Sequence, residues 1–600
     1  MTNPSGSRVF QPGHGASPLR ELLLIRGFRF TCAIAFSLQF VCVFTSARAA
    51  TYHVEQRVPA ADDKNDGSQE RPWKSISRAA KAAIAGDVVI IGNGVYRESV
   101  KIANSGTADR PIRFTADDAA NVIVTGADRI TRWEADAATP GVFTTTWGYD
   151  FIGWNPTHTH PGDDEHLLIG RCEQVFVNGY PLRQVLLRSQ MARGTFFVDL
   201  VGKKLFAWSA DNRNLSKDGA IVEASTRSAI WESAGEYVET RGIRFRYAAN
   251  MAQHGAAIFS GAHNRVEDCI FERTNGCGAT FLGTDIAVSH CTFADNGQLG
   301  FGADRAHRLR MSDCRILRNN VKGFSRGWEA GGDKLVLCRA AVIEHCIFRE
   351  NRGNGIWFDI GNEDCVVKNC LIDGNEDAGI FDEISYGLIA TDNVIINNGL
   401  ADTSGAWGAA GGICLSSSPN SVIERNLLVG NKEGLSFREQ ERSTPRIDAK
   451  PNSRGEKIWN HDERIDHNIL AYNRDAQLRG WFDVEDERLW PAAMQEKKQS
   501  LSLEGLKLQI SDNIYAVHSG QAMFVWGVAW KRNKAYASLD DVRHELGLEQ
   551  RSASKAIAFK NVAERDFRID AGSDSQIDGC YPKGSVPETM LSQPSAGAVK

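Results

Sequence analysis

A four-residue pattern of hydrophobic and polar positions recurs through the middle of the chain. In each copy an apolar residue is followed by two polar residues and then by a cysteine or an asparagine. The last positions of these copies are Cys269, Cys291, Cys314, Cys346, Cys370, Asn393, Asn426 and Asn468. The shortest steps, 269 to 291, 291 to 314, 346 to 370 and 370 to 393, are 22, 23, 24 and 23 residues. Such a period is typical of a solenoid.

A second column of asparagines lies five residues after the first. Its members are Asn296, Asn319, Asn351, Asn375, Asn398, Asn431 and Asn473. Asparagine tolerates a left-handed backbone and can hydrogen-bond to its equivalents on neighbouring turns, so the column predicts a sharp corner between short strands. The residues between the two columns are β-branched and aromatic, which favours strands. We therefore expect an all-β right-handed parallel β-helix. A leucine-rich repeat has a similar period, but its leucine and asparagine consensus is absent and no helix-period segment recurs between the strands.

From residue 50 onward the sequence divides into four segments, one of which is the repeat. Residues 50–128 should form an N-terminal cap and the first β-helix turns, with an amphipathic helix that ends near Ala83 and covers the open end of the core. Residues 129–240 break the period with short, tryptophan-rich and turn-rich strands, which predicts an inserted β-sandwich-like domain. The repeat continues over residues 241–535. Residues 536–600 should close the solenoid at its other end.

The first 49 residues have the pattern of an export signal. Arg20, Arg26 and Arg29 precede the apolar run 30–44, and residues 47–49 offer a small-x-small cleavage site. The run is too short for a convincing membrane anchor. We therefore expect a secreted or periplasmic protein with no stable membrane insertion.

Charge and cysteine content narrow the possible partners and cross-links. The formal net charge is -5 and no basic stripe occurs, which argues against a nucleic-acid partner. Thirteen cysteines in an exported chain normally suggest disulfides. Five of them, however, occupy the first column, where stacked side chains about 4.8 Å apart behave as small packed hydrophobes. Without Cys32 and Cys42 an odd number remains, so at least one thiol must be unpaired, and we expect most to be free.

Two carboxylates fall at equivalent positions on consecutive turns. When each turn is aligned on the glycine after the asparagine corner, Asp359 lies above Glu383. Neighbouring parallel strands are about 4.8 Å apart, and retaining glycosidases hold their carboxyl groups about 5 to 5.5 Å apart. Ionising both groups costs Coulomb energy, so one should keep a proton while the other stays charged. Lys334 on the preceding turn is the cation expected to keep the nucleophile ionised.

Other polar and aromatic residues are candidates for contact with a sugar. Trp357 offers an aromatic face for the apolar side of a sugar ring. Further candidates for substrate binding are Glu329, Lys334, Asp382, Asp304 and Arg438. Asp304 falls two turns before Asp359, and Arg438 continues the column after Glu383. The competing interpretation is that these residues are ordinary solvated strand ends.

The segment from Trp328 to Ser385 resembles glycoside hydrolase family 120, β-xylosidases built on a right-handed β-helix interrupted by a β-sandwich. The resemblance rests on three motifs, which are residues 329–335, 355–359 and 381–383. It implies that Asp359 is the nucleophile and Glu383 the acid/base. The chain departs from the family in having Asp382 directly before Glu383, so Asp382 is an alternative acid. Ile360 and Gly361 replace an aromatic neighbour of the nucleophile.

The sequence favours a secreted glycoside hydrolase that acts on polysaccharide or oligosaccharide and needs no cofactor. Two alternatives remain. One is a Ca²⁺-dependent polysaccharide lyase, because β-helices often bind this ion through clustered aspartates. The other is a non-catalytic carbohydrate-binding protein. The segment from His158 to His166 contains possible metal ligands, but its spacing fits no helical zinc motif, and we expect a loop over the substrate cleft.

Overall fold

The computed structural model describes residues 49–118, 121–151, 168, 170–217, 219–401, 410–450, 455–482, 487–496, 501–528, 530–562, 564–569 and 574–583. Residues 1–48 of the expected export signal and the segment from His158 to His166 lie outside this part of the chain. Within it, no helix has both the length and the apolar character needed to cross a membrane.

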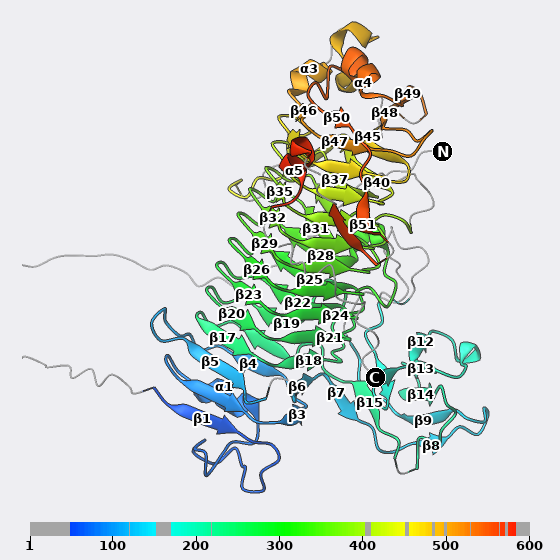
Figure 1. Cartoon of the computed structure of the whole chain (residues 1–600). Coiled ribbons are helices and arrows are strands. Elements are labelled where there is room, and N and C mark those ends of the chain that lie inside the picture. Colours follow the sequence, from blue (N-terminus) through cyan, green and yellow to red (C-terminus); the bar gives the residue numbers. More distant parts are fainter. Residues whose placement is uncertain are drawn as a thin grey trace, which may run out of the picture. The chain divides into compact units, whose positions relative to one another are not determined.

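Three long sheets of thirteen strands each build the solenoid (Figure 1). Successive strands of one turn enter sheets A, B and C in that order. Sheet A contains β1 (Thr51–Val54), β2 (Val88–Ile91), β5 (Ile112–Ala116), β17 (Val238–Arg241), β20 (Arg265–Glu267), β23 (Ala287–Ser289), β26 (Arg310–Ser312), β29 (Val342–Glu344), β32 (Val366–Lys368), β35 (Ile389–Thr391), β38 (Val422–Glu424), β43 (Arg464–Asp466) and β46 (Gln509–Ser511).

Sheet B follows sheet A around each turn. It contains β3 (Gly94–Tyr96), β6 (Val122–Thr125), β18 (Arg244–Arg246), β21 (Ile270–Glu272), β24 (Thr292–Ala294), β27 (Arg315–Leu317), β30 (Ile347–Arg349), β33 (Leu371–Asp373), β36 (Val394–Ile396), β39 (Leu427–Val429), β44 (Ile469–Ala471), β47 (Ile514–Ala516) and β50 (Ala553–Ser554).

Sheet C completes each turn and carries the candidate site. It contains β4 (Val100–Ile102), β16 (Trp231–Ser233), β19 (Gly255–Phe259), β22 (Cys277–Phe281), β25 (Leu299–Asp304), β28 (Gly331–Val336), β31 (Ile356–Asp359), β34 (Ile380–Glu383), β37 (Gly411–Ser416), β40 (Glu433–Glu439), β45 (Ala476–Phe482), β48 (Phe524–Val528) and β49 (Asn533–Tyr536). Its strands are parallel except for the final pair, β48 and β49, which are antiparallel.

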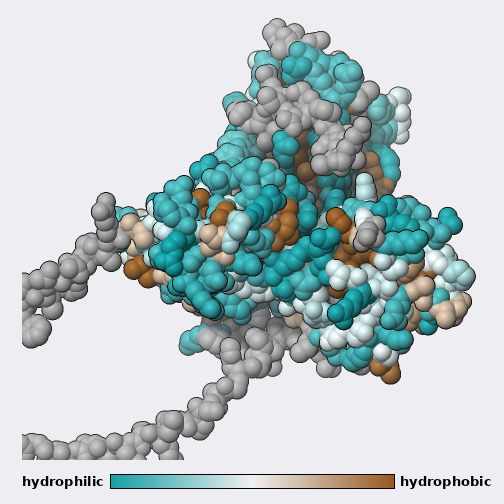
Figure 2. Space-filling view, turned by 90° about the horizontal axis from the view of Figure 1, so that it is seen from below, coloured by the Kyte–Doolittle hydropathy of each residue, from teal (hydrophilic) through white to brown (hydrophobic). Residues whose placement is uncertain are grey.

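Helix α1 (Ile76–Ala82) covers the first turns of the solenoid. Its N-cap is Ser75, whose side chain accepts a hydrogen bond from the backbone of Arg78. Ile76 and Ala79 are fully buried in the same core as the inward side chains of the three sheets. Figure 2, which views this end of the molecule, shows a largely hydrophilic surface with apolar residues in separate patches.

An insertion interrupts the chain between β6 in sheet B and β16 in sheet C. One of its sheets contains β7 (Ala127–Arg129), β10 (Val175–Val177), β11 (Tyr180–Pro181) and β15 (Val222–Ser225). The other contains β8 (Glu134–Ala135), β9 (Phe143–Thr146), β12 (Arg183–Val185), β13 (Thr195–Asp199) and β14 (Lys204–Trp208). Side chains from both sheets share one apolar core, as in a sandwich. Its last strand ends at Ser225, and β16 and β17 already pair within the solenoid, whereas the sequence analysis placed the boundary at 240.

The corners are stabilised by the two columns found in the sequence. Asn319 illustrates the second column, because its side-chain amide donates 2.9 Å to Oδ1 of Asn351 and 3.1 Å to the carbonyl of Phe293. In the first column the backbone N–H of Cys291 points at Sγ of Cys314, at 3.4 Å. The asparagines are fully buried. Each one therefore satisfies backbone groups that the sharp corner leaves unpaired.

The left-handed residue of each corner is not the asparagine itself. The sequence analysis assigned that conformation to the column residues, but the structure gives it to the residue before them. Arg318, before Asn319, has a φ of 49°, and His290, before Cys291, has a φ of 53°. The reason is that a column side chain must point inward to reach the next turn, so the preceding residue makes the bend.

The C-terminal segment returns along the outside of sheet B. Helix α4 (Leu539–Leu546) follows the last strand of sheet C, and β51 (Phe559–Asn561), β52 (Asp566–Ile569) and α5 (Ser575–Cys580) come after it. Phe567 and Cys580 pack with outward apolar residues of sheet B in a second core. Arg565 forms an ion pair with Asp373 of β33. Short helical turns also occur at η1 (Arg188–Gln190), η2 (Glu487–Leu489), η3 (Ala492–Met494) and α3 (Leu503–Leu506).

The eleven cysteines in the described part of the chain are all free and buried. The expectation of mostly unpaired thiols is therefore confirmed for these residues. Burial also raises the pKa of most of these thiols, as at Cys346 and Cys370, and keeps them protonated.

These thiols predict a simple result for chemical modification. Unfolding the protein in an alkylating reagent without reductant should modify Cys269, Cys291, Cys314, Cys346 and Cys370, because each is an unpaired thiol. The folded protein should resist the reagent, since all five thiols are buried in the core and out of its reach. Peptide mass spectrometry reads out both states. Disulfide-linked peptides from these positions would contradict the corner arrangement.

Candidate active site

The outer face of sheet C carries two columns of side chains. Because side chains alternate along a strand, Leu335, Phe358 and Leu415 point into the core, and their neighbours point outward. The first outward column runs through Asp304, Val336, Asp359, Glu383, Ser416 and Arg438. The second contains Lys334, Trp357, Phe381, Cys414 and Ser436. This register is the one expected from the glycine alignment of the sequence.

Asp359 and Glu383 are direct partners at the ends of β31 and β34. Both are buried, with 7% and 4% of their surface exposed. Parallel pairing holds the two backbones about 4.8 Å apart with the side chains on the same face. Among the described residues, Oδ1 of Asp359 has no hydrogen-bond partner. That oxygen is therefore a buried acceptor without a donor in this part of the chain.

Lys334 on β28 neutralises two carboxylates. Its ammonium lies 2.9 Å from Oδ2 of Asp359 and 3.1 Å from Oε1 of Glu329, and it lies 4.4 Å from the ring centroid of Trp357. Burial works against the charge of Lys334, but the two carboxylates outweigh it and raise the pKa of Lys334. Lys334 therefore stays a cation beside Asp359 and Glu329.

Trp357 and the residues around it form the apolar side of the site. Trp357, Phe381 and Cys414 occupy consecutive strands and pack with Ala378 in a small cluster. The indole Nε1 of Trp357 donates a hydrogen bond of 3.2 Å to Oε2 of Glu383. Only 2% of Trp357 is exposed. Its ring thus positions Glu383 and Lys334 and offers little open face for stacking on a sugar.

Glu383 has the electrostatic surroundings of a proton donor. Burial and the charge of Asp359 raise the pKa of Glu383 above its ordinary value. Arg442 and Arg438 act in the opposite direction, and Nη1 of Arg442 donates a hydrogen bond of 2.8 Å to Oε1 of Glu383. The net upward shift favours the protonated form of Glu383.

Arg442 is a residue that the sequence analysis did not identify as part of the site. It begins the hairpin of β41 (Arg442–Thr444) and β42 (Glu456–Ile458), which leaves the solenoid after β40. Arg446 in the same excursion bonds to Glu363 at 2.8 Å and lies 4.1 Å from the ring centroid of Tyr386. Nothing in the sequence of this hairpin indicated that the Arg442 side chain would reach Glu383.

Asp382 lies on the wrong face of its strand for the role assigned to it. Its partners in the register are Phe358 and Leu415, which are core residues, and it is 1% exposed. Burial raises the pKa of Asp382 to about 8, so the carboxyl is mainly protonated at neutral pH. Asp333, on the inner face of β28, is a second core carboxyl with a raised pKa, and its Oδ1 accepts the backbone N–H of Trp357.

Asp304 stands apart from the carboxylate pair. Val336 lies between it and Asp359 in the column, and Asp304 is exposed and ion-paired with Arg305 at 2.7 Å. Arg438 lies two strands beyond Glu383 and is buried. The structure therefore brings together Glu329, Lys334, Trp357, Asp359 and Glu383, with Arg438 near Glu383. Across the described residues, no group of three or more His, Cys, Asp or Glu side chains is arranged to hold a metal ion.

Comparison with known proteins supports the fold. A family model described as the right handed beta helix region matches residues 228–383 and 335–446. The uncharacterized protein YwoF of Bacillus subtilis (strain 168) is 35% identical over 68 residues, which are 11% of this chain and 14% of that protein. The chain thus spans only a small part of the length of this curated relative.

Two solved structures are similar over most of the chain. The complex of XylC with xylose aligns with a TM-score of 0.60 and 18% identity, over 79% of this chain and 86% of that one. A mannuronic acid specific polysaccharide family 6 lyase from human gut microbiota aligns with a TM-score of 0.47 and 12% identity, over 90% and 97%. At these identities the likeness concerns the fold. Together with the three parallel sheets, the family model and the alignment with XylC confirm the prediction that the chain is a right-handed parallel β-helix protein.

Proposed function

We propose that this protein is an exported glycoside hydrolase of the retaining type. Asp359 is its nucleophile and Glu383 its acid/base. The observation that carries the proposal is the direct pairing of Asp359 with Glu383 on adjacent strands, with Lys334 2.9 Å from Asp359. The expected export signal and the polar surroundings of the pair suit an enzyme that meets glycans outside the cytoplasm.

The proposed reaction has two steps. First, the carboxylate of Asp359 attacks the anomeric carbon while Glu383 donates its proton to the glycosidic oxygen, so that the leaving group departs as an alcohol. A covalent glycosyl ester with Asp359 remains. Second, Glu383, now ionised, takes a proton from water, and the resulting hydroxide attacks the same carbon and releases Asp359.

Each neighbouring residue has a defined part in this scheme. Lys334 keeps Asp359 ionised for the attack, and Glu329 holds Lys334 in place. The hydrogen bond from Trp357 and the ion pair with Arg442 fix the two oxygens of Glu383. The fold similarity to XylC, whose structure contains xylose, supports neutral sugars such as xylosides as the first substrates to test.

Substitutions at the three neighbouring carboxyls test these roles. Asp359→Asn should abolish turnover of aryl glycosides, because it removes the nucleophile. Glu383→Gln should lower kcat by about 10²- to 10⁴-fold with a poor leaving group, and much less with one that needs no protonation. The control is Asp382→Asn, which should keep turnover because that side chain points into the core. Steady-state kinetics on two leaving groups measures all three variants. Full activity in both Asp359→Asn and Glu383→Gln would refute the assignment.

The pH profile should respond to Arg442. Glu383 acts as an acid only when protonated, so activity is present below its pKa and is lost as pH rises through it. Removal of the Arg442 charge takes away an interaction that lowers this pKa. Arg442→Gln should therefore move the alkaline limb of kcat/KM to higher pH. Arg446→Gln, in the same excursion but bound to Glu363, is the matched control and should leave the limb in place. A downward shift in Arg442→Gln would contradict the proposed role.

The stereochemistry of the product distinguishes the proposed mechanism from its alternatives. Since one strand spacing leaves little room for water between Asp359 and the sugar, the first product should keep the anomeric configuration of the substrate. Proton NMR before mutarotation gives the answer. An inverted product would mean that the activating base lies farther away. An unsaturated, ultraviolet-absorbing product from a uronate polymer would instead identify a lyase.

A further inference from the structure

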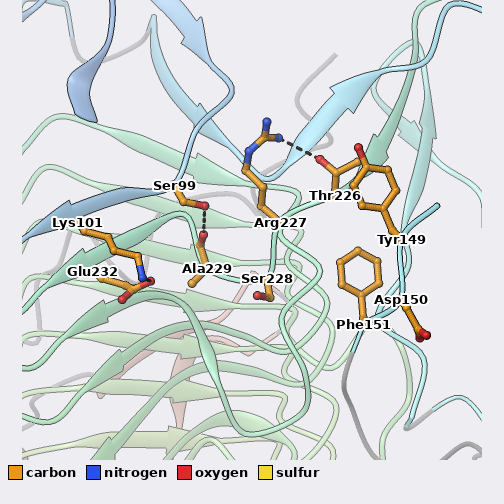
Figure 3. Close-up of a pocket in the computed structure, with 10 residues that line it drawn as sticks. All are labelled: Ser99, Lys101, Tyr149, Asp150, Phe151, Thr226, Arg227, Ser228, Ala229 and Glu232. Carbon is orange, nitrogen blue, oxygen red and sulfur yellow. Dashed lines mark hydrogen bonds and ion pairs between the residues drawn. The ribbon is translucent and has the colours of Figure 1, made fainter. Parts of the chain in front are cut away.

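A pocket of about 440 Å³ lies where the insertion meets the first turns of the solenoid, away from the carboxylate pair (Figure 3). Lys101 on β4 and Glu232 on β16 line one side of it. Tyr149, Asp150 and Phe151 of the insertion line the other. Ser99, Thr226, Arg227, Ser228 and Ala229 complete the lining. The pocket therefore depends on both parts of the chain.

The insertion contributes two aromatic side chains, Tyr149 and Phe151, to the lining of the pocket. The rings of Tyr149 and Phe151 are nearly parallel, with an interplanar angle of 8° and centroids 6.4 Å apart. Tyr149 also contacts Trp147, which is buried in the core of the insertion, with centroids 4.9 Å apart. Tyr149 itself is 39% exposed. A pair of parallel aromatic rings at a polar rim is suited to the apolar C–H face of a sugar ring.

The solenoid side of the pocket is polar but balanced in charge. The Lys101 ammonium lies 3.2 Å from Oε1 of Glu232, and Nη1 of Arg227 lies 2.9 Å from Oδ1 of Asp128. The lining contains two cations, Lys101 and Arg227, and two carboxylates, Asp150 and Glu232. Such a lining offers hydrogen bonds to hydroxyl groups without an excess of either sign. It therefore favours an uncharged sugar over a uronate.

The pocket lies on the same face of sheet C as the carboxylate pair. Lys101 pairs with Glu232, and the register continues through Ile258, Thr280 and Gly302 to Lys334. Four strand spacings, or about 19 Å, thus separate Glu232 from Lys334. None of the three intervening outward residues is charged, and a side-chain atom added at Gly302 would meet no atom within 4 Å. The pocket and the carboxylate pair are therefore connected by one column of outward side chains on successive strands of sheet C.

We propose that this pocket is a distal subsite that binds an uncharged oligosaccharide whose other end occupies the site at Asp359 and Glu383. This inference rests on the proposed function, which makes the site at Asp359 and Glu383 the place where the glycosidic bond is cleaved. The subsite makes the protein select long chains over short ones, because a disaccharide at the carboxylates cannot span the five strand spacings, about 24 Å, between the strand of Asp359 and that of Glu232.

The test compares ligand lengths in wild type and in Tyr149→Ala/Phe151→Ala. The probes are xylobiose, xylohexaose, cellohexaose and a mannuronate hexamer. Calorimetric binding of a neutral hexamer should weaken about fivefold to tenfold in the double variant, while xylobiose binding stays unchanged. Tyr180→Ala removes a 74%-exposed tyrosine elsewhere on the insertion and is the matched control. Lys101→Ala perturbs the solenoid side of the pocket independently, in case the double variant unfolds the insertion.

Binding and turnover separate the two proposals. Length-dependent loss of binding supports the subsite even if no glycan is hydrolysed, a result that would refute only the proposed function. With activity present, kcat/KM for xylohexaose should fall in the variant and that for xylobiose should not. Equal hexamer affinity in wild type and both variants would overturn the subsite. Failure of both neutral hexamers to bind, or preference for the mannuronate hexamer, would overturn it as well.

Discussion

Parallel pairing between successive turns is the constraint on which the candidate site depends. Asp359 and Glu383 are 24 residues apart in sequence, and only the register of β31 with β34 makes them neighbours. The same register stacks Trp357 on Phe381 and the corner asparagines on one another. Because a shift by one residue would send each side chain to the opposite face, the corners that fix the register also fix the chemistry.

The alternation of faces gives neighbouring acids opposite properties. Asp382 and Glu383 are adjacent in sequence, yet one is enclosed by core residues and the other meets Asp359, Trp357 and Arg442. Burial raises the pKa of both, but in the described part of the chain only Glu383 has an ionic partner within reach. A protonated acid on the inner face and an ion-paired acid on the outer face can therefore occupy consecutive positions.

Much of this arrangement follows from the sequence. The two columns predicted the coil, and the glycine alignment placed Asp359, Glu383 and Lys334 together, because a repeating fold converts spacing into position. The conformation of the excursions could not be predicted in this way. Arg442 reaches Glu383 through a hairpin outside the repeat, and Tyr149 belongs to an insertion with its own core. Asp382 stayed an alternative acid in the sequence analysis because it is adjacent to Glu383, and the strand pairing places it on the inner face.

The C-terminal segment changes how the solenoid can come apart. In a simple stack, each turn touches only its neighbours, so the terminal turns can fray one at a time. Here the chain passes the last turn and then lies back across the middle ones, where Arg565 meets Asp373 and the backbone N–H of Lys583 donates to Asp392. The last turns are thus tied to the middle of the stack through their own chain. Fraying from that end must also detach the C-terminal segment from the middle turns. The turns around the carboxylate pair therefore belong to one cooperative unit with the last turns.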